Sequence, residues 1–304
     1  MRIMKLLLVA AASLGLATAA HAAGGGKHPH GPEEGWTFEG FFGTFDQAQL
    51  QRGYKVYREV CAACHSMDLI NFRNLGMKNG PFYDPDYPNP NDNPVVKALA
   101  SSTAEVDIIN QEDGSDTTRT RLTSDPFPAP FANDATARYA NNGALPPDLS
   151  VIVKARSGGA DYIYSLLVGY PTEEEMSTKY ALLDTSNASQ HYNPYFAGDV
   201  TPQWGGDPRH RHEGDESAHA YEMLPPGGFL AMSPPLFEDG VEFDDGTPAS
   251  VHQMAEDVVT FLAWASEPKA QIRKQMGLVT LIYLFILAVL VFLSYKQIWR
   301  NVEH

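Results

Sequence analysis

The spacing of apolar and polar positions along the chain predicts short amphipathic helices separated by long loops. Residues 44–61 open with a Thr-x-x-Gln capping-box pattern and continue with apolar side chains at helical spacing, which predicts a first helix. An Asn-Pro pair opens a second predicted helix over residues 93–111. Residues 113–133 are polar and then rich in proline, so they are predicted to form a loop.

The second half of the chain continues this alternation of short helices and loops. Helical patterns recur over residues 134–142, 148–156 and 162–168, with glycine and proline pairs between them. Residues 171–222 are polar and are predicted to be a solvated loop. A Ser-x-x-Gln cap then precedes an apolar stripe over residues 250–267, which a proline ends. The expected fold class is therefore mainly α, with long loops.

Apolar runs at the two ends predict export and membrane anchoring. Residues 1–22 combine early cations, an apolar run and an Ala-His-Ala end, which is typical of a signal peptide. Residues 277–295 are uncharged and apolar, and at about 1.5 Å per residue they would cross a hydrocarbon core of roughly 30 Å. We expect residues 23–268 on the periplasmic side of a bacterial inner membrane, and a single-pass anchor with a short cytoplasmic tail over residues 269–304.

The charge balance narrows the choice of partners. The chain has 37 acidic and 22 basic residues, a formal net charge of −15, and residues 23–268 alone carry −21. A phosphate backbone would be repelled, so no nucleic-acid partner is expected. The same field would speed the arrival of a basic protein. Glu238, Asp239, Asp244 and Asp245 form a candidate docking surface, with an ordinary solvated loop as the alternative.

The sequence Cys61-Ala62-Ala63-Cys64-His65 points to a specific cofactor. Two thiols at this spacing can form thioethers to the vinyl groups of a haem, and the histidine can bind the iron, so the pattern predicts one covalently bound haem c. A zinc site would need further close ligands, and these are the only two cysteines. A redox thiol pair would follow a buried strand rather than a helix, and a disulfide across this short gap would be strained.

Two Met-x-Pro-Pro sequences offer a second axial ligand, at Met223 and Met232. A thioether opposite histidine suits a low-spin haem that carries electrons, and the prolines stiffen the ligand loop. Spacing alone does not choose between the two methionines. Arg156 and Tyr162 are candidates to bind a haem propionate, because guanidinium pairs well with carboxylate, although each also fits an ordinary surface or packing role.

Several further motifs span most of the chain. They are NNGALPPDLS at residues 141–150, NPYF at 193–196, MSPPL at 232–236, FDDGTP at 243–248 and WASEP at 264–268. With the cysteine motif and the C-terminal apolar run, and in this order, they resemble the cytochrome c1 family, the haem subunits of cytochrome bc1 complexes. Residues 200–222 depart from the family pattern and resemble an insertion.

The resemblance implies a set of haem ligands. Cys61 and Cys64 would bind the haem covalently, and His65 would be one axial ligand. Met232 is favoured over Met223 as the other, because the family's ligand methionine lies just before a proline pair and an acidic Phe-Asp-Asp-Gly-Thr stretch.

The resemblance also implies a place in a respiratory chain. Arg156, with Tyr162 close by, would bind a haem propionate. The Rieske iron–sulfur protein would reduce the haem and a soluble or membrane-anchored cytochrome c would oxidise it, within a dimeric complex that contains cytochrome b. Such a subunit is one electron relay of an enzyme complex and has no catalytic residues of its own.

Two alternative functions share part of this pattern. A membrane-anchored cytochrome c of another dehydrogenase would have the same haem motif and anchor. A haem ligand sensor or peroxidase would need an open or labile sixth position on the iron, and a di-haem peroxidase would need a second Cys-x-x-Cys-His sequence, which the chain lacks.

Overall fold

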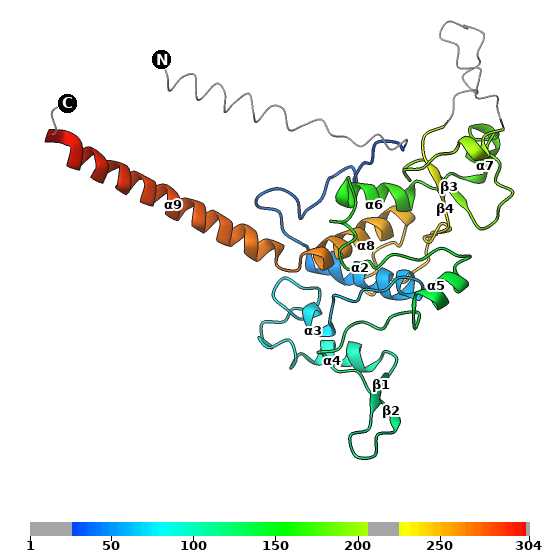
Figure 1. The fold of residues 1–304 in the computed structure, drawn as a ribbon, viewed down its shortest axis with the longest axis horizontal. Helices are drawn as coiled ribbons and strands as arrows, with labels where there is room; N and C mark the ends of the chain where they lie inside the picture. Colours follow the sequence, from blue (N-terminus) through cyan, green and yellow to red (C-terminus); the bar gives the residue numbers. More distant parts are fainter. Residues whose placement is uncertain (1–25, 206–224, 302–304) are drawn as a thin grey trace, which may run out of the picture.

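The structure is a computed structural model that describes residues 26–205 and 225–301. The predicted signal peptide, Met223 and residues 206–222 of the predicted insertion lie outside the described residues. Figure 1 shows a helical domain from which one long helix extends. This arrangement confirms the expected fold class, mainly α with long loops.

The elements have the following bounds. The helices are α2 (Gln47–Glu59), α3 (Phe72–Leu75), α4 (Pro94–Ser101), α5 (Asp134–Ala140), α6 (Gly159–Val168), α7 (Glu173–Thr178), α8 (Val251–Ser266) and α9 (Ala270–Ile298), with the 3-10 turns η1 (Cys61–Ala63), η2 (Thr201–Gln203) and η3 (Trp299–Asn301). The strands are β1 (Val106–Ile109), β2 (Asp116–Arg119), β3 (His191–Asn193) and β4 (Gly228–Leu230). They form two antiparallel pairs, β1 with β2 and β3 with β4.

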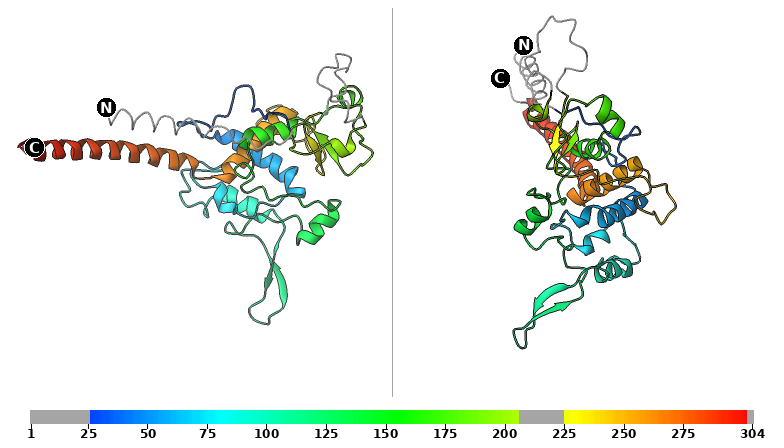
Figure 2. Two further views of the ribbon diagram at one scale, coloured as in Figure 1. Left: turned by 45° about the horizontal axis from the view of Figure 1, so that its top comes forward. Right: turned by 90° about the vertical axis from the view of Figure 1, so that its right-hand side faces the viewer.

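The core of the domain forms where α2 and α6 pack against α8 (Figures 1 and 2). A Cβ atom at Gly53 of α2 would lie 2.0 Å from the carbonyl oxygen of Asp257 on α8, so only glycine permits this close crossing. Phe261, which also lies on α8, is fully buried. A phenylalanine buried in this way stabilises the fold by roughly 1.5–3 kcal/mol relative to an exposed one.

Ion pairs tie α2 to α8 and to the acidic stretch that precedes α8. The Arg52 guanidinium lies 2.8 Å from the carboxylate of Asp257 and 2.8 Å from that of Asp245. Burial raises the pKa of Asp257, and the hydrogen bond from Arg52 acts in the opposite direction. Lys55 pairs with Asp244 at 2.7 Å. Two of the four acids considered for docking therefore already pair with cations of this chain.

Helix α2 begins later than the capping pattern predicts. Its N-cap is Asp46, whose side chain accepts a hydrogen bond of 2.8 Å from the backbone N–H of Gln49. Thr44, the predicted cap, instead donates its N–H to the carbonyl of Thr37 at 3.0 Å. The prediction is wrong at this end because Thr44 closes a loop.

The second predicted helix, over residues 93–111, is too long. Helix α4 begins after the predicted cap Asn93 but ends at Ser101, and the hydroxyl of Thr103 donates back to the carbonyl of Ala100 at 2.7 Å. Residues 106–119 then form the β1–β2 hairpin, so the predicted loop over 113–133 is also wrong in part. The Val-Asp-Ile-Ile sequence of β1 suits a strand, because β-branched side chains pack well on a pleated surface.

The remaining predictions divide in the same way. Helices α5, α6 and α8 confirm the patterns at 134–142, 162–168 and 250–267, and Ser250 caps α8 as predicted. Residues 148–156 form successive turns rather than a helix. The predicted loop over 171–222 is wrong in part, since it contains α7 and β3.

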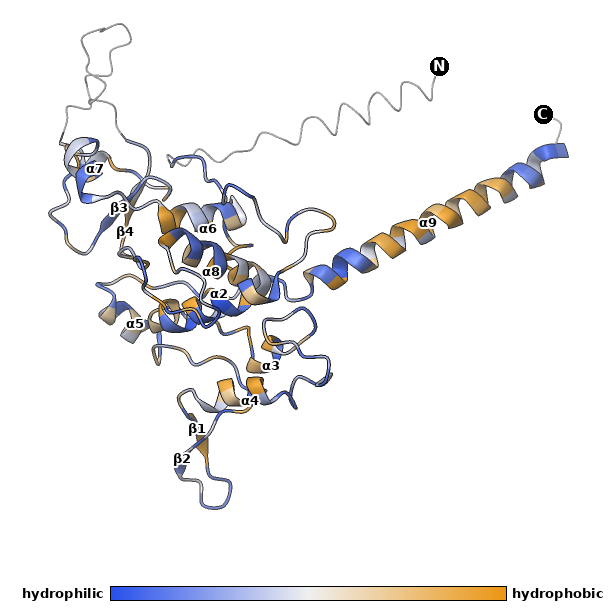
Figure 3. Ribbon diagram, turned by 180° about the vertical axis from the view of Figure 1, so that it is seen from behind, coloured by the Kyte–Doolittle hydropathy of each residue, from blue (hydrophilic) through white to orange (hydrophobic). Residues whose placement is uncertain are grey.

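Helix α9 is long and apolar enough to cross a membrane. Figure 3 shows its apolar middle between polar ends. Glu267, the C-cap residue of α8, joins the two helices: it accepts hydrogen bonds from Arg273 in α9 and, at 2.6 Å, from Lys154. The bond from Arg273, assisted by Lys154, lowers the pKa of Glu267 to about 2, so the carboxylate stays charged at neutral pH.

Candidate haem site

The two cysteines lie at the C-terminal end of α2, where the chain leaves the helix. The backbone N–H groups of Cys64 and His65 both donate to the carbonyl of Cys61, at 3.1 and 2.9 Å. This turn gathers the three side chains in one place. Cys61 is half-buried, Cys64 is exposed, and no disulfide joins them. Burial raises the pKa of the Cys61 thiol to about 12, so the free thiol is protonated at neutral pH.

The ring of His65 is held by a hydrogen bond to the backbone. Its ring nitrogen Nδ1 lies 2.8 Å from the carbonyl oxygen of Pro147. A carbonyl can only accept, so Nδ1 carries the proton and Nε2 keeps its lone pair for a metal. Burial lowers the pKa of His65, while the bond to Pro147 and the charge of Asp148 act in the opposite direction. The imidazole is therefore favoured in its neutral, ligating form.

Asp148 fixes the chain that supports His65. Its carboxylate accepts hydrogen bonds from the Ser66 hydroxyl at 2.9 Å and from the N–H groups of Asp68 and Ser150, each at 2.8 Å. Burial alone would raise the pKa of Asp148, but these bonds outweigh it and hold the pKa below its ordinary value. Residues 66–68 and 148–150, far apart in sequence, are thus joined beside the histidine. The residues after Asp148 form turns in place of the predicted helix: the N–H of Ile152 donates to the carbonyl of Leu149 at 3.3 Å, and that of Lys154 donates to Val151 at 3.0 Å.

Met232 lies two residues beyond β4 and is half-buried. Its carbonyl oxygen accepts a hydrogen bond of 2.8 Å from the hydroxyl of Tyr170. Burial raises the pKa of Tyr170, so the hydroxyl stays protonated and keeps donating. Figures 1 and 2 show that α2 ends on the side of the domain away from α9, the side that also carries the β3–β4 sheet. The Met232 segment leaves this sheet.

Arg156 and Tyr162 are neighbours. Arg156 is exposed in the turn before α6 and, within residues 26–205 and 225–301, forms no ion pair. Burial raises the pKa of Tyr162, and the positive charge of Arg156 acts in the opposite direction. Tyr162 in turn contributes to the raised pKa of Tyr170. Arg156 and Tyr162 are thus close enough to influence each other's charge, and Tyr162 lies near Tyr170, the residue that binds the Met232 carbonyl.

Comparison with known proteins identifies the family. The Cytochrome C1 family profile matches residues 36–302. Cytochrome c1 of Rhodospirillum rubrum is 36% identical over 312 residues, which cover 99% of both chains. The mitochondrial cytochrome c1 heme protein of Saccharomyces cerevisiae is 42% identical over 275 residues, 90% of this chain and 74% of the relative. The mitochondrial cytochrome b-c1 complex catalytic subunit of Candida albicans is 43% identical over 269 residues, 88% and 76% of the two chains.

This chain belongs to the cytochrome C1 family. The resemblance stated from the motifs is therefore confirmed. Membership of this family also confirms the expected cofactor, a covalently bound haem c. The residues present fit such a group, because two unbonded thiols and a histidine with a free Nε2 lie at the end of one helix.

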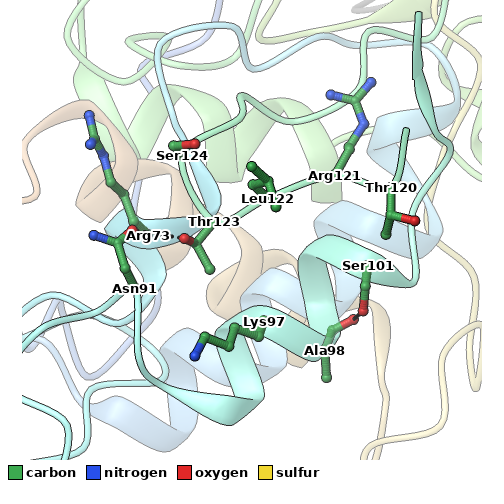
Figure 4. A pocket seen from close by; sticks show the side chains of 10 residues that line it. All are labelled: Arg73, Asn91, Lys97, Ala98, Ser101, Thr120, Arg121, Leu122, Thr123 and Ser124. Carbon is green, nitrogen blue, oxygen red and sulfur yellow. Dashed lines mark hydrogen bonds between the residues drawn. The ribbon is translucent and has the colours of Figure 1, made fainter. Parts of the chain in front are cut away.

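A pocket of about 640 Å³ lies away from these residues, between α4 and residues 120–124 (Figure 4). Its lining includes none of the cysteines, His65 or Met232. In Figure 4 the charged ends of Arg73 and Arg121 both point upward on opposite sides of the view, while that of Lys97 points to the left, so the three do not meet at one point. The pocket is separate from the site that carries the cytochrome C1 motifs.

Sequence reasoning missed Tyr170 and the role of Asp148. Tyr170 stands 62 positions before Met232, and no spacing rule links a tyrosine to a distant backbone carbonyl. The only local indication was the position of Tyr170 between Gly169, which ends a helix, and Pro171, a setting that fixes the backbone but does not identify a partner. For Asp148 the signal was stronger, because an aspartate followed two residues later by serine favours a side-chain-capped turn.

Proposed function

We propose that this chain is the electron-transfer subunit of a cytochrome bc1 complex, with haem c joined to Cys61 and Cys64. The observation that carries the proposal is the bond from Nδ1 of His65 to the Pro147 carbonyl, which leaves Nε2 free for iron. When bound, haem c supplies an iron that changes its oxidation state by one electron. The protein holds that group and fixes its surroundings.

Each proposed ligand has a distinct task. Cys61 and Cys64 would hold the group: each S–H would add across a vinyl C=C of the haem, the sulfur bonding to one carbon and the hydrogen to the other, which keeps the group attached in both oxidation states. Nε2 of His65 and the sulfur of Met232 would be the protein's ligands to the iron. Tyr170 holds the Met232 backbone, and the prolines at 234 and 235 stiffen the loop. With both ligands supplied by the protein, the group would carry electrons rather than bind small molecules.

Arg156 and Tyr162 are proposed to bind a haem propionate. The guanidinium is exposed and pairs with no described acid, so it is available to a carboxylate. Tyr162 keeps its proton because burial raises its pKa, and it can donate to the same group. A propionate neutralised in this way costs less to hold near the protein.

The partners follow from the family. The Candida albicans relative is named as a subunit of the cytochrome b-c1 complex, and by analogy this chain would assemble with cytochrome b in a dimeric complex. We propose that the Rieske iron–sulfur protein reduces it and that a soluble or membrane-anchored cytochrome c oxidises it. The haem domain would face the periplasm, with α9 in the inner membrane. The acids Glu238 and Asp239, which pair with no described cation, are the better candidates for docking a basic acceptor.

Substitution of the two methionines tests the proposed ligand. Met232→Leu is expected to remove the charge-transfer absorption that a thioether–iron bond gives in the oxidised protein. Met223→Leu is the matched control and is expected to retain it. The opposite result would transfer the ligand role to Met223, and retention of the absorption in both variants would show that neither Met232 nor Met223 is the ligand.

Purification from membranes in mild detergent tests the complex. The proposal expects a b-type cytochrome and an iron–sulfur protein to copurify with the full-length chain. Copurification with a different dehydrogenase would support the alternative of an anchored cytochrome c for that enzyme. Rapid carbon monoxide binding by the native reduced protein would instead favour a ligand sensor.

A further inference from the structure

The loop of residues 37–44 presents two exposed aromatic side chains. Phe41 is 48% exposed and Phe42 is 83% exposed. Their rings meet edge to face, with centroids 5.0 Å apart. Adjacent exposed phenylalanines form an apolar patch, and such patches mark contact surfaces more often than isolated side chains do.

The loop is held firmly against α9. The ammonium group of Lys274 donates to the carbonyl of Phe38 at 2.7 Å and to that of Gly43 at 3.2 Å. Phe38 stacks on Phe45, with ring centroids 5.1 Å apart, and both pack against the core. A Cβ atom at Gly43 would lie 1.8 Å from the carbonyl oxygen of Glu39, so the tight return of the loop requires glycine.

The two rings lie level with the start of the apolar part of α9. A pocket of about 110 Å³ between loop and helix is lined by Phe41, Phe42, Gln271 and Leu278, among others. Leu278 belongs to the apolar stretch of residues 277–295, whereas Gln271 lies in the polar first turn. Figure 1 shows the loop beside this end of α9, and Figure 3 shows the helix changing from polar to apolar there.

We infer that Phe41 and Phe42 insert into the lipid interface beside α9 and give the domain a second contact with the bilayer. The inference rests on the proposed membrane anchoring by α9. If α9 spans the membrane, the first lipids around it touch this loop, and burying both rings removes apolar surface from water. Two contact points restrict the tilt of the domain more than one helix does.

Spin labelling of the full-length, haem-loaded chain in phosphatidylcholine vesicles tests the inference. Thioether attachment leaves no native thiol free, so Phe42→Cys places a nitroxide at one site. The haem is kept oxidised in every sample, because reductants of the iron also reduce a nitroxide. Collisions with oxygen, which concentrates in lipid, are compared with collisions with a water-soluble nickel chelate. Leu284→Cys on α9 is the lipid control, and Tyr139→Cys, 93% exposed on α5, is the aqueous control.

The expected oxygen-to-nickel collision ratio at position 42 is severalfold above that of position 139 and below that of position 284, which lies further along the apolar part of α9. A ratio like that of position 139, or protection from both reagents, would overturn the inference. If position 284 itself behaves as aqueous, the proposed anchoring fails instead. Phe41→Cys repeats the measurement at an independent position, and because both side chains are exposed, neither substitution should disturb folding.

Discussion

At His65 the ring nitrogen Nδ1 lies 2.8 Å from a carbonyl oxygen that can accept but not donate. That one bond selects the tautomer, orients the ring and leaves Nε2 for a metal. The carbonyl belongs to Pro147, and the neighbouring Asp148 fixes its position through three hydrogen bonds. A residue 82 positions away therefore prepares the proposed iron ligand.

The Tyr170 hydroxyl gives a prediction at the same scale. Tyr170→Phe removes the hydrogen bond to the Met232 carbonyl and should destabilise the ligand loop by about 0.5–1.5 kcal/mol. The expected result is faster displacement of the methionine by added cyanide, followed by the loss of the thioether–iron absorption. Tyr164→Phe, which removes a hydroxyl bonded to His252, is the matched control. In this variant cyanide should displace the methionine at the wild-type rate. Equal rates in all three proteins would contradict the role given to Tyr170.

Residues of the candidate site were predictable where their chemistry is local. The two cysteines and His65 stand within five positions, so the sequence alone indicates the site. Met232 needed the resemblance to the family, because two similar Met-x-Pro-Pro sequences exist and spacing does not separate them. Tyr170 was missed because its role is a contact with a backbone group 62 positions away.

Among the elements, the crossing of α2 and α8 depends on one glycine. Gly53→Ala would bring a methyl group within 2.0 Å of the Asp257 carbonyl, so the helices must separate. The expected loss is about 1–3 kcal/mol of unfolding free energy, as in other overpacked cores. Chemical denaturation in detergent measures this loss. Gly277→Ala, where an added Cβ meets nothing within 4 Å, should leave the stability nearly unchanged. An undisturbed Gly53 variant would mean that α2 and α8 are less tightly packed than described.

The turn that follows β2 should respond to acid. Two hydrogen bonds from Arg119, of 2.5 and 2.8 Å, lower the pKa of Asp125 to about 2. Because the folded pKa lies below the unfolded value of about 3.9, the stabilisation is complete above pH ~4 and is lost as the pH falls toward about 2. Solvent screening limits the expected loss to the order of 1 kcal/mol.

Denaturation midpoints between pH ~2 and ~5 measure this effect in the wild type and in Asp125→Asn. Asp125→Asn should lose less stability than the wild type as the pH falls, because it lacks the carboxylate that acid protonates. Asp116→Asn, an exposed change in β2, is the control and should follow the wild type. Parallel curves for all three proteins would show that the Arg119 pair adds no stability.

Helices were predicted correctly where local sequence determines the structure, and elements that depend on distant contacts were not. Helices α5, α6 and α8 were predictable because their caps and apolar spacing agree with their packing. The turns at 148–156 and the β1–β2 hairpin were not. In the first, Asp148 gives its carboxylate to residues 66–68, and in the second, strand pairing of Val106–Ile109 replaces the end of a helix. Both depend on partners that lie outside a local window.

For the whole molecule, the excess of acidic residues should govern how fast a basic acceptor arrives. The chain carries a formal net charge of −15. Electron transfer to a basic c-type cytochrome should slow by a factor on the order of 10 as the salt concentration rises from ~10 mM to ~0.5 M. Stopped-flow absorbance measures this rate. Anionic ferricyanide should show the opposite trend, because salt relieves its repulsion. A salt-independent rate with the basic protein would show that electrostatic attraction does not speed its arrival.

The short junction at Glu267 also affects how the domain is oriented relative to α9. One carboxylate grips both Lys154, in the turn that leads to Arg156, and Arg273 at the root of α9. These largely exposed ion pairs favour one orientation of the domain relative to α9. Under the proposed function, that preference would help to keep the haem at one height above the lipid, and the partner proteins would do more of the moving between donor and acceptor.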